Sequence, residues 1–422
     1  MTRTRQTISV IGLGYVGLPT AATFASRGLS VIGVDIRADA VERIQSGKAH
    51  FIEPDLDIVL RAVVTAGNLR ATTQPEPADA FLIAVPTPIR DDKTADLTAV
   101  RSALASIAPV LKRGDLIIIE STCPVGTTQG AAEQLRGLRP DLTFPDTDPE
   151  SSDILLAYSP ERILPGHTLR ELIENPRTYG GLDHRSALAA RDLYSVFATG
   201  PQRLTTAPTA ELSKLVENAY RDVNVAFANE LSLVCDALGL DVWSVIRLAN
   251  LHPRVNILAP GAGVGGHCIP VDPWFIHEAL PQQTPLIRAS REVNDGKPRF
   301  LADKIAGIAS RFREPKIALL GLTYKPNVDD LRESPALHIA CDLAERRLGR
   351  LMIVEPHVPE LPDSLADRTD VELMALQDAV AEADVVAILV AHDRFRNLNR
   401  GAVSAKIVVD AVGLLAQPLE AA

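Results

Sequence analysis

The sequence predicts an α/β protein of two doubly wound Rossmann-like domains joined by a long central helix. Two parts of the chain carry short, nearly continuous apolar runs that end at turn residues and alternate with helical patterns. Such runs are typical of parallel strands that are buried on both faces of a sheet. The chain has 422 residues with 46% hydrophobic content, which is enough for two or three buried cores.

The apolar runs set the expected order of the elements. In the first part we expect strands at residues 8–11, 31–34, 80–85, 116–120 and 154–158. In the second part we expect strands at residues 316–321, 351–355, 385–390 and 407–410. Between the two parts, a long helical pattern begins at an N-cap, Thr209, and runs to Gly239. The predicted organisation is an N-terminal domain over 1–205, a central helical region over 206–310 and a C-terminal domain over 311–422.

The composition excludes several classes of function. A net charge of −10 without a long basic run argues against a nucleic-acid or anionic-membrane surface. No apolar stretch approaches the ~20 residues of a membrane span. Residues 1–5 lead into a strand rather than a signal-peptide core, so we expect a cytoplasmic protein. The four cysteines lack the spacing of a disulfide framework or a zinc site, so we expect no metal.

A glycine-rich turn, residues 12–17 (Gly-Leu-Gly-Tyr-Val-Gly), follows the first strand and opens a helical segment. Its glycines suit a tight turn, a close approach to a pyrophosphate and close helix packing, with the helix N-terminus facing the phosphates. Asp35 ends the next strand, where its carboxylate would bind ribose hydroxyls and repel a 2′-phosphate. The pattern therefore predicts NAD rather than NADP, and Arg37 softens that preference without reversing it. Without the strand before it, the helix after it and the acid, the motif alone is a weak signal, and a glycine-rich turn that binds nothing would explain it.

A single cysteine, Cys268, lies behind a glycine pair and four residues before Asp272. Alone, this segment is better explained as a tight turn around a buried thiol, because free cysteine usually packs as a small hydrophobic residue. Lys214 and Asn218 share one face of the central helix, and by themselves they are better explained as a solvated face.

Several loops follow predicted strands. Ligands of open parallel sheets bind beyond the carboxyl ends of the strands, so residues 85–88, 120–124 and 159–162 are candidate site loops. In the C-terminal domain, the loop over 324–334 offers Lys325 and Arg332 for phosphate contacts, although a solvated loop is the default explanation of its charges. That domain lacks Gly-x-Gly-x-x-Gly, which favours a ligand other than a second dinucleotide.

Motifs along nearly the whole chain together resemble the nucleotide-diphosphate-sugar 6-dehydrogenases of the UDP-glucose/GDP-mannose dehydrogenase family. They lie at residues 8–15, 52–56, 83–88, 221–224, 252–258, 265–273 and 330–335. The resemblance implies that a primary alcohol at sugar C6 is oxidised twice to a carboxylate and that two NAD are consumed. It further implies that Cys268 adds to the intermediate aldehyde as a thiohemiacetal and is then oxidised to a thioester, which water hydrolyses.

The resemblance also implies roles for other catalytic side chains. Lys214 and Asn218 stabilise negative charge on oxygen near C6. Asp272 orients a water or Lys214 and takes part in proton transfer, and Thr122 holds that water. Glu161 is the general base for the aldehyde and thioester steps.

The remaining implied contacts divide between two ligands. The expected cofactor-binding residues are Gly12, Gly14, Tyr15, Val16, Gly17, Asp35, Arg37, Pro86, Thr87 and Thr122. The expected UDP-sugar-binding residues are Glu161, Arg162, Lys214, Asn218, Arg221, His252, Arg254, Gly265, Lys325 and Arg332. The expected partner is a second copy of the chain, in a homodimer built around the central helix with Arg254 reaching across the interface.

The residue before Asp272 bears on the sugar. UDP-glucose enzymes usually have a lysine there, and Val271 in its place resembles the N-acetylhexosamine branch. Within that branch, residues 252–256 favour UDP-N-acetyl-D-mannosamine, used for bacterial envelope polysaccharide, over UDP-N-acetylglucosamine or UDP-glucose. Two other classes stay open: a catalytically silent regulator that binds NAD and a UDP-sugar, and a two-electron 2-hydroxyacid dehydrogenase. The presence of Cys268 argues against both.

Overall fold

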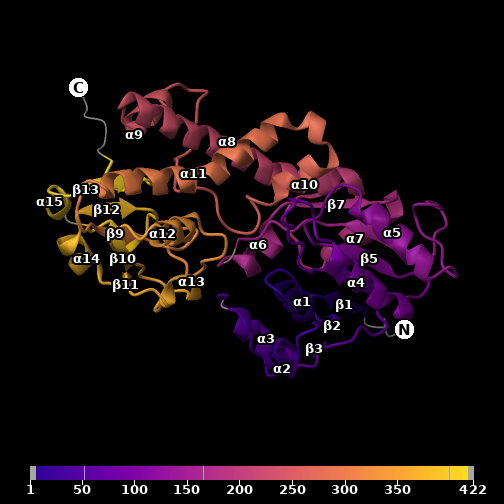
Figure 1. Cartoon of the computed structure of the whole chain (residues 1–422). Coiled ribbons are helices and arrows are strands. Elements are labelled where there is room, and N and C mark those ends of the chain that lie inside the picture. The colour runs from indigo at the N-terminus through magenta and orange to yellow at the C-terminus, as the bar shows by residue number, and fades with distance from the viewer. Residues whose placement is uncertain (1–5, 52, 165, 399, 417–422) are drawn as a thin grey trace. The chain divides into compact units, whose positions relative to one another are not determined.

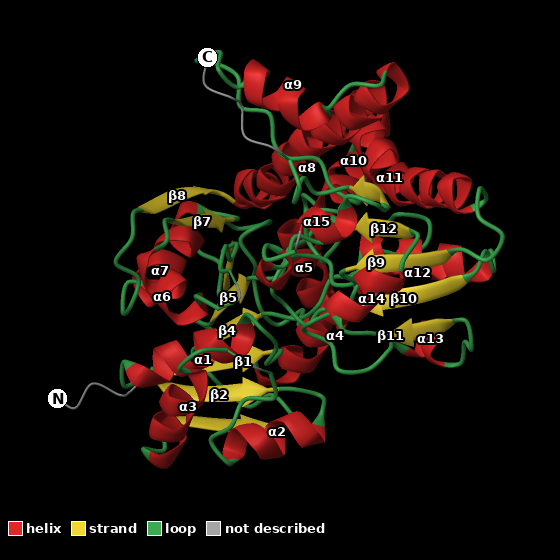
Figure 2. Ribbon diagram, turned by 90° about the vertical axis from the view of Figure 1, so that its left-hand side faces the viewer, coloured by secondary structure: helices red, strands yellow, loops and turns green. Residues whose placement is uncertain are grey.

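The computed structural model describes residues 6–51, 53–164, 166–398 and 400–416 (Figure 1). The chain divides into two compact units, Met1–Val216 and Glu217–Ala422, and each is described by itself. Each unit contains a mainly parallel sheet with helices packed against it (Figure 2). The predicted fold class of two doubly wound halves joined by a long helix is confirmed. Among the described residues, no helix has the length and apolar character needed to cross a membrane.

The sheet of the first unit has the strand order β3-β2-β1-β4-β5-β6-β7-β8. Its described pairs are parallel except β6 with β7, which is antiparallel. All strands expected in this half are present, and β3, β7 and β8 are additional. The strands are β1 Thr7–Ile11, β2 Ser30–Val34, β3 Leu69–Thr72, β4 Ala80–Ile83, β5 Leu116–Ile119, β6 Leu155–Tyr158, β7 Arg177–Gly181 and β8 Gln202–Thr206.

Helices cover both faces of this sheet because its inner strands are apolar on both sides. In β5, Leu116 and Ile118 pack into one core, and Ile117 and Ile119 pack into the other. Helices α1, α2, α3, α6 and α7 line the first core, and α4 and α5 line the second. The helices are α1 Gly17–Ser26, α2 Ala38–Gln45, α3 Leu56–Thr65, α4 Thr98–Ile107, η1 Ala108–Val110, α5 Thr127–Leu138, α6 Thr168–Glu174 and α7 His184–Tyr194.

The sheet of the second unit has the strand order β11-β10-β9-β12-β13, and its described pairs are parallel. All strands expected here are present. The strands are β9 Lys316–Leu320, β10 Arg350–Val354, β11 Val371–Leu373, β12 Val385–Ile388 and β13 Ile407–Asp410, of which β11 was not expected. The helices are α9 Val242–Ala249, α10 Asp272–Ala279, η2 Pro281–Gln283, α11 Pro285–Ala309, α12 Pro335–Glu345, α13 Asp363–Ala366, α14 Leu376–Glu382, η3 Asp393–Phe395 and α15 Arg400–Val403.

The long helix α8, Ala207–Leu238, begins in the first unit and ends in the second. A Thr209 N-cap places the first helical residue at Ala210, so the predicted start is wrong by three residues. Pro208 fits inside the first turn because the N–H that proline lacks has no helical partner there. The predicted end is confirmed: Gly239 has a φ of 67°, and the Leu240 N–H donates to the Cys235 carbonyl oxygen at 2.8 Å.

A buried polar network joins α8 to α11 within the second unit. The Arg291 guanidinium, 1% exposed, donates to the Asp222 carboxylate at 2.5 Å. The Asn294 amide donates to the same carboxylate at 2.8 Å and accepts from Asn229 at 2.9 Å. Asn229 in turn accepts from the Gly261 N–H at 2.9 Å. These hydrogen bonds link α8, α11 and the backbone at Gly261, and so hold the two helices and the chain before the Cys268 turn in one arrangement.

Replacing Arg291 with Met should destabilise the second unit by roughly 3–5 kcal/mol, because the change leaves the Asp222 charge buried without its ionic partner. The matched control is Arg288→Met, which removes an exposed ion pair with Glu292 on the same helix and should cost less than about 1 kcal/mol. Urea unfolding followed by tryptophan fluorescence reports on this unit, because Trp243 and Trp274 both lie in it. Equal losses in the two variants would contradict the assigned role of the network.

Candidate active site

Of the three glycines in the turn of the first unit, only one has open space beside it that a ligand could fill. A Cβ at Gly12, whose φ is 92°, would lie 2.5 Å from the Ala84 carbonyl oxygen, and a Cβ at Gly17 would lie 1.9 Å from the Gly12 carbonyl oxygen. A Cβ at Gly14 would meet nothing within 4 Å. The turn is therefore packed at its ends and open in the middle, beside the N-terminus of α1. This arrangement fits a bound pyrophosphate.

Asp35 lies at the end of β2, beside the same turn. Its carboxylate accepts hydrogen bonds from the Leu13 N–H at 3.1 Å and the Arg37 N–H at 3.0 Å. Each oxygen keeps a lone pair for a ribose hydroxyl. The Arg37 side chain is half exposed, with its Nε 3.7 Å from the carboxylate. The residues expected to hold NAD thus fit the adenosine end of that cofactor.

Hydrogen bonds join two of the loops that follow strands, the loop after β4 and the loop after β5. The Ser121 hydroxyl donates to the Val85 carbonyl oxygen at 2.7 Å and accepts from the Val85 N–H at 3.0 Å. The Thr87 hydroxyl donates to the Thr122 carbonyl oxygen at 2.5 Å. The structure therefore brings Pro86, Thr87 and Thr122, all expected cofactor contacts, to one edge of the sheet. Cys123 is fully buried in the core below them.

Glu161, in the third loop, is part of a buried charged cluster. One of its oxygens accepts from the Arg162 N–H at 2.7 Å, and the other is ion-paired with Arg177. The Arg177 guanidinium lies 4.6 Å from the centre of the Tyr194 ring, and the Tyr194 hydroxyl donates to Glu120. Burial raises the pKa of Glu120 to about 7, although the positive charge of Arg177 opposes that shift.

Sequence reasoning did not find Arg177, Tyr194 or the role of Glu120. Arg177 opens β7, which the apolar pattern does not reveal, and a buried arginine gives no signal of its own in a single sequence. Glu120 ends a predicted strand, and a position at a strand end was the one signal in the sequence that could have indicated its role. The cluster fixes the orientation of the Glu161 carboxylate from inside the protein.

Replacing Glu120 with Gln should change how stability depends on pH. The folded chain keeps the Glu120 proton up to a pH of about 7, whereas the unfolded carboxyl releases it near its ordinary pKa of 4.5. The unaltered protein therefore loses stability as the pH rises through this window, by at most roughly 3 kcal/mol from this group.

The melting temperature of Glu120→Gln should consequently fall less than that of the unaltered protein between about pH 5 and about pH 8. The matched control, Glu133→Gln, changes an exposed glutamate on α5 and should keep the original pH dependence. An identical pH dependence in the Glu120 variant would show that this carboxyl is not the buried acid described above.

The start of α8 is anchored beside the Thr122 loop by Glu211, a residue that sequence reasoning used only as a helix-start signal. Its buried carboxylate accepts from the Gly126 N–H at 2.6 Å, the Thr128 N–H at 2.8 Å and the Thr128 hydroxyl at 2.6 Å. These groups open α5, so Glu211 acts as its cap. Burial raises the pKa of Glu211, although its hydrogen bonds from Thr128 and Gly126 oppose the shift. Lys214 lies one turn further along this anchored helix.

In the second unit, the turn that carries Cys268 leads directly into α10. The Asp272 N–H donates to the Cys268 carbonyl oxygen at 2.9 Å. The Asp272 side chain is buried and accepts from the Asn218 amide at 2.5 Å, whereas Cys268 is exposed. The structure thus brings Asn218 and Asp272 together and presents the neighbouring thiol at the surface of this unit.

The glycine pair before Cys268 allows this turn to lie on the loop over 324–334. A Cβ at Gly265 would lie 2.5 Å from the Glu333 carbonyl oxygen. A Cβ at Gly266, whose φ is 88°, would lie 2.9 Å from the Tyr324 ring. The loop expected to bind phosphate therefore packs against the cysteine turn.

The expected substrate contacts of this unit are mostly exposed. Arg332 is ion-paired with Asp330 at 2.7 Å, and the Lys325 ammonium lies 5.4 Å from the centre of the Tyr324 ring. Burial and the charge of Arg332 lower the pKa of His267, the residue next to the cysteine.

A second group of expected contacts lies on and after α8. The Arg254 N–H donates to the His252 ring at 3.3 Å. Arg221, His252 and Arg254 are all exposed. Within the described residues, no group of three or more His, Cys, Asp and Glu side chains could hold a metal ion.

The glycine turn with its acid, followed by a cysteine turn packed on a basic loop, defines a nicotinamide-dependent dehydrogenase. The chain belongs to the UDP-glucose/GDP-mannose dehydrogenase family. Its NAD binding domain matches residues 6–198, its central domain residues 208–296 and its UDP binding domain residues 318–417. NAD is therefore the cofactor, as predicted, and the UDP binding domain implies a UDP-sugar substrate.

Individual relatives match over nearly the full length. A UDP-N-acetyl-D-mannosamine dehydrogenase of Escherichia coli is 53% identical over 97% of this chain and 99% of its own. An NDP-N-acetyl-D-galactosaminuronic acid dehydrogenase of Ralstonia nicotianae is 54% identical over 97% of this chain and 96% of its own. The solved structure of a UDP-D-ManNAc dehydrogenase from Pyrococcus horikoshii has a TM-score of 0.86 at 37% identity, over 98% of this chain and 97% of that one.

Proposed function

We propose that this enzyme oxidises UDP-N-acetyl-D-mannosamine at C6, in two NAD-dependent steps, to UDP-N-acetyl-D-mannosaminuronate. The observation that carries the proposal is the exposed Cys268 beside a buried Asp272 that Asn218 holds in place. A two-electron dehydrogenase has no need of a nucleophile at this position. Similarity to the mannosamine enzyme of E. coli supports the choice of sugar.

In the first oxidation, the sugar C6 hydroxyl loses a proton and C6 loses a hydride. When bound, NAD supplies the hydride acceptor for both oxidations. The Lys214 ammonium and the Asn218 amide stabilise the negative charge that develops on the C6 oxygen. Thr122 and Asp272 hold the water through which the proton leaves.

In the second oxidation, the Cys268 thiolate forms a C–S bond to the aldehyde carbon, and the carbonyl oxygen takes a proton. Loss of a hydride from C6 and of the hydroxyl proton converts this thiohemiacetal into a thioester. Water then adds to the thioester carbon, the C–S bond breaks, and the thiol and the carboxylate separate. Glu161 accepts the proton of that water, since each of its carboxylate oxygens keeps a second lone pair beyond the bond it already accepts.

The proposal extends to organisation and setting. The NAD-binding part comprises residues 1–205, the central part 206–310 and the UDP-sugar-binding part 311–422. Arg162, Arg221, His252, Arg254, Lys325 and Arg332 contact the UDP-sugar, and Arg254 acts across the interface of a homodimer. The exposed apolar side chains of α8 support that dimer, and they include Leu212, Val216, Tyr220, Phe227, Val234 and Leu238. The enzyme acts in the cytoplasm, and its product enters a bacterial envelope polysaccharide.

The test of the substrate is the amount of NADH formed from a limiting amount of UDP-N-acetyl-D-mannosamine with excess NAD. Two equivalents are expected, because the alcohol is oxidised twice. One equivalent would mean that oxidation stops at the aldehyde. The absence of NADH with this sugar would overturn the assignment.

A second candidate substrate follows from the similarly close relationship to the Ralstonia enzyme. UDP-N-acetyl-D-galactosamine therefore belongs in the same assay, together with UDP-N-acetylglucosamine and UDP-glucose. A higher kcat/KM for any of these three would move the assignment to that sugar. If none of the sugars is oxidised and NAD still binds measurably, the result would favour the alternative of a catalytically silent regulator.

Replacing Cys268 with Ala should abolish formation of the uronate and leave no more than one NADH per sugar, because the thioester can no longer form. The matched control is Cys341→Ala, which removes a partly buried thiol of the C-terminal half and should keep two NADH per sugar. The measurement combines NADH absorbance with mass spectrometry of the product. Uronate formation by the Cys268 variant at the original rate would exclude the thioester route.

A further inference from the structure

Both units carry the same acid-and-turn geometry after their first strands. In the first unit, Gly12 has a φ of 92°, and Asp35 accepts from the Leu13 N–H at 3.1 Å and from the N–H two residues beyond itself at 3.0 Å. Each Asp35 oxygen accepts one backbone hydrogen bond and keeps a lone pair for a ribose hydroxyl of the cofactor.

In the second unit, Gly321 has a φ of 95°, and Glu355 takes the place of the acid. It accepts from the Leu322 N–H at 2.7 Å and from the His357 N–H at 2.9 Å. The backbone arrangement is therefore the same, although this half lacks the glycine pattern that admits a dinucleotide.

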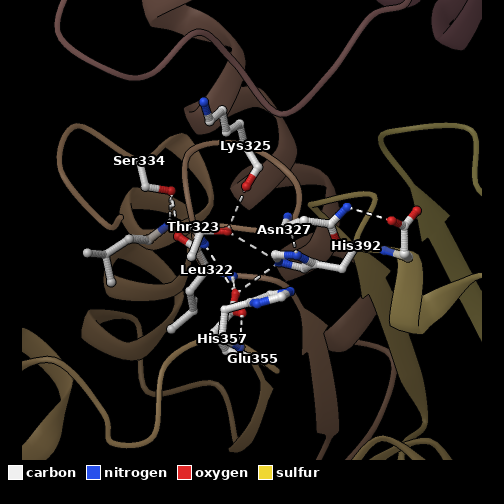
Figure 3. Close-up of polar contacts among 10 residues, drawn as sticks. Leu322, Thr323, Lys325, Asn327, Ser334, Glu355, His357 and His392 are labelled. Atoms are coloured by element: carbon white, nitrogen blue, oxygen red, sulfur yellow. Dashed lines mark hydrogen bonds and ion pairs between the residues drawn. The ribbon is translucent and has the colours of Figure 1, made fainter. Parts of the chain in front are cut away.

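The two units differ in that a histidine, His392, covers and hydrogen-bonds the carboxylate in the second unit. His392 follows β12, and its side chain and that of Glu355 are fully buried. Its Nδ1 accepts from the Asn327 N–H at 3.0 Å, so the ring proton is on Nε2, which lies 3.1 Å from the Glu355 carboxylate and donates to it. Figure 3 shows the ring between the two groups. Glu355 is thus an acceptor for protein donors and not for a ribose.

The charge of Glu355 agrees with this arrangement. Burial alone would raise the pKa of this carboxyl. The hydrogen bonds from His392, Leu322 and His357 outweigh burial, and they hold the pKa below its ordinary value. Glu355 is therefore a charged acceptor, which strengthens each of the hydrogen bonds that it receives.

The groups around His392 also fix the loop that carries Lys325. The Thr323 hydroxyl donates to the Lys325 carbonyl oxygen at 3.0 Å. Asn327 has a φ of 61°, and its amide donates to Asp393 at 2.7 Å and accepts from the Asp393 N–H at 3.0 Å. In Figure 3 the Lys325 ammonium points away from this cluster while the Lys325 carbonyl points into it. The loop is anchored on its inner side, and its cation is left to face outward.

We propose that His392, held by Glu355, is a positioning residue that fixes the loop over 323–327 so that Lys325 presents its ammonium to the diphosphate of the substrate. The inference rests on the proposed function, in which this half binds a UDP-sugar. His392 does not touch the reacting atoms, so its loss should weaken substrate binding and leave the chemical steps intact.

The test is His392→Phe, which keeps a ring of similar size beside Phe395 and His357 but removes the hydrogen bonds of both ring nitrogens. The KM for the UDP-sugar should rise about tenfold, the effect of roughly 1.4 kcal/mol of lost binding. The kcat and the KM for NAD should stay within about twofold, a split that a general loss of structure would not give. His392→Asn keeps an acceptor near the position of Nδ1 and should recover part of the loss.

The matched control is His338→Phe, which makes the same change at an exposed histidine on α12 and should alter none of these constants. A substrate KM for His392→Phe equal to that of the control would overturn the inference. If His392→Phe does not fold, as judged by circular dichroism, Asn327→Gly provides the second test. Glycine adopts the positive φ freely and removes only the side-chain bonds to Asp393, so the substrate KM should rise in the same direction.

Calorimetric binding of UDP separates this inference from the proposed function. If the unaltered enzyme binds UDP but oxidises none of the sugars, the proposed function fails while a weaker UDP affinity in His392→Phe still supports the positioning role. If the unaltered enzyme does not bind UDP, or if both forms bind it equally, the positioning role is wrong.

Discussion

Each unit depends on a backbone turn that is too crowded for a side chain. A Cβ at Gly12 would lie 2.5 Å from the Ala84 carbonyl oxygen, and a Cβ at Gly321 would lie 2.4 Å from the Val390 Cβ. Both glycines have positive φ, and both N–H groups donate to the end of the neighbouring strand. Only such a turn allows the first strand to end against its two neighbours while the next N–H reaches an acid. The ligand-binding edge of each sheet is built outward from this turn.

The two turns diverge two residues later, and this divergence separates their ligands. The first unit has Gly14 at that point, with open space around it. The second has Thr323, whose buried hydroxyl bonds within its own loop and lies 3.3 Å from the ring of His392. At this position the second unit therefore has a side chain with partners of its own, where the first unit has open space. The same scaffold serves as a cofactor cradle in one half and as an internally braced loop in the other.

The sequence predicted those features that depend on neighbouring residues. The apolar runs located the inner strands, and the strand-end rule located the loops of Thr122 and Glu161. The strand β3 was missed because exposed Arg70 interrupts a run of only four residues. Contacts between residues far apart in the chain could not be predicted from the sequence pattern. Glu211 bonds to Thr128, 83 residues away, and His392 lies 37 residues from its acid. Such pairings arise only when strands far apart in the chain become neighbours in a sheet.

The exposure of the cysteines has a consequence for how long the enzyme survives. Cys123 and Cys235 are buried, whereas Cys268, the proposed nucleophile, is exposed. A thiol that is open to an aldehyde is equally open to peroxide, which converts it to a sulfenic acid and, with further exposure, to acids that thiols do not reduce. Oxidative damage would fall on the reactive sulfur first and leave the fold intact. The working lifetime of the protein would therefore be set by the redox state of its surroundings before it is set by unfolding.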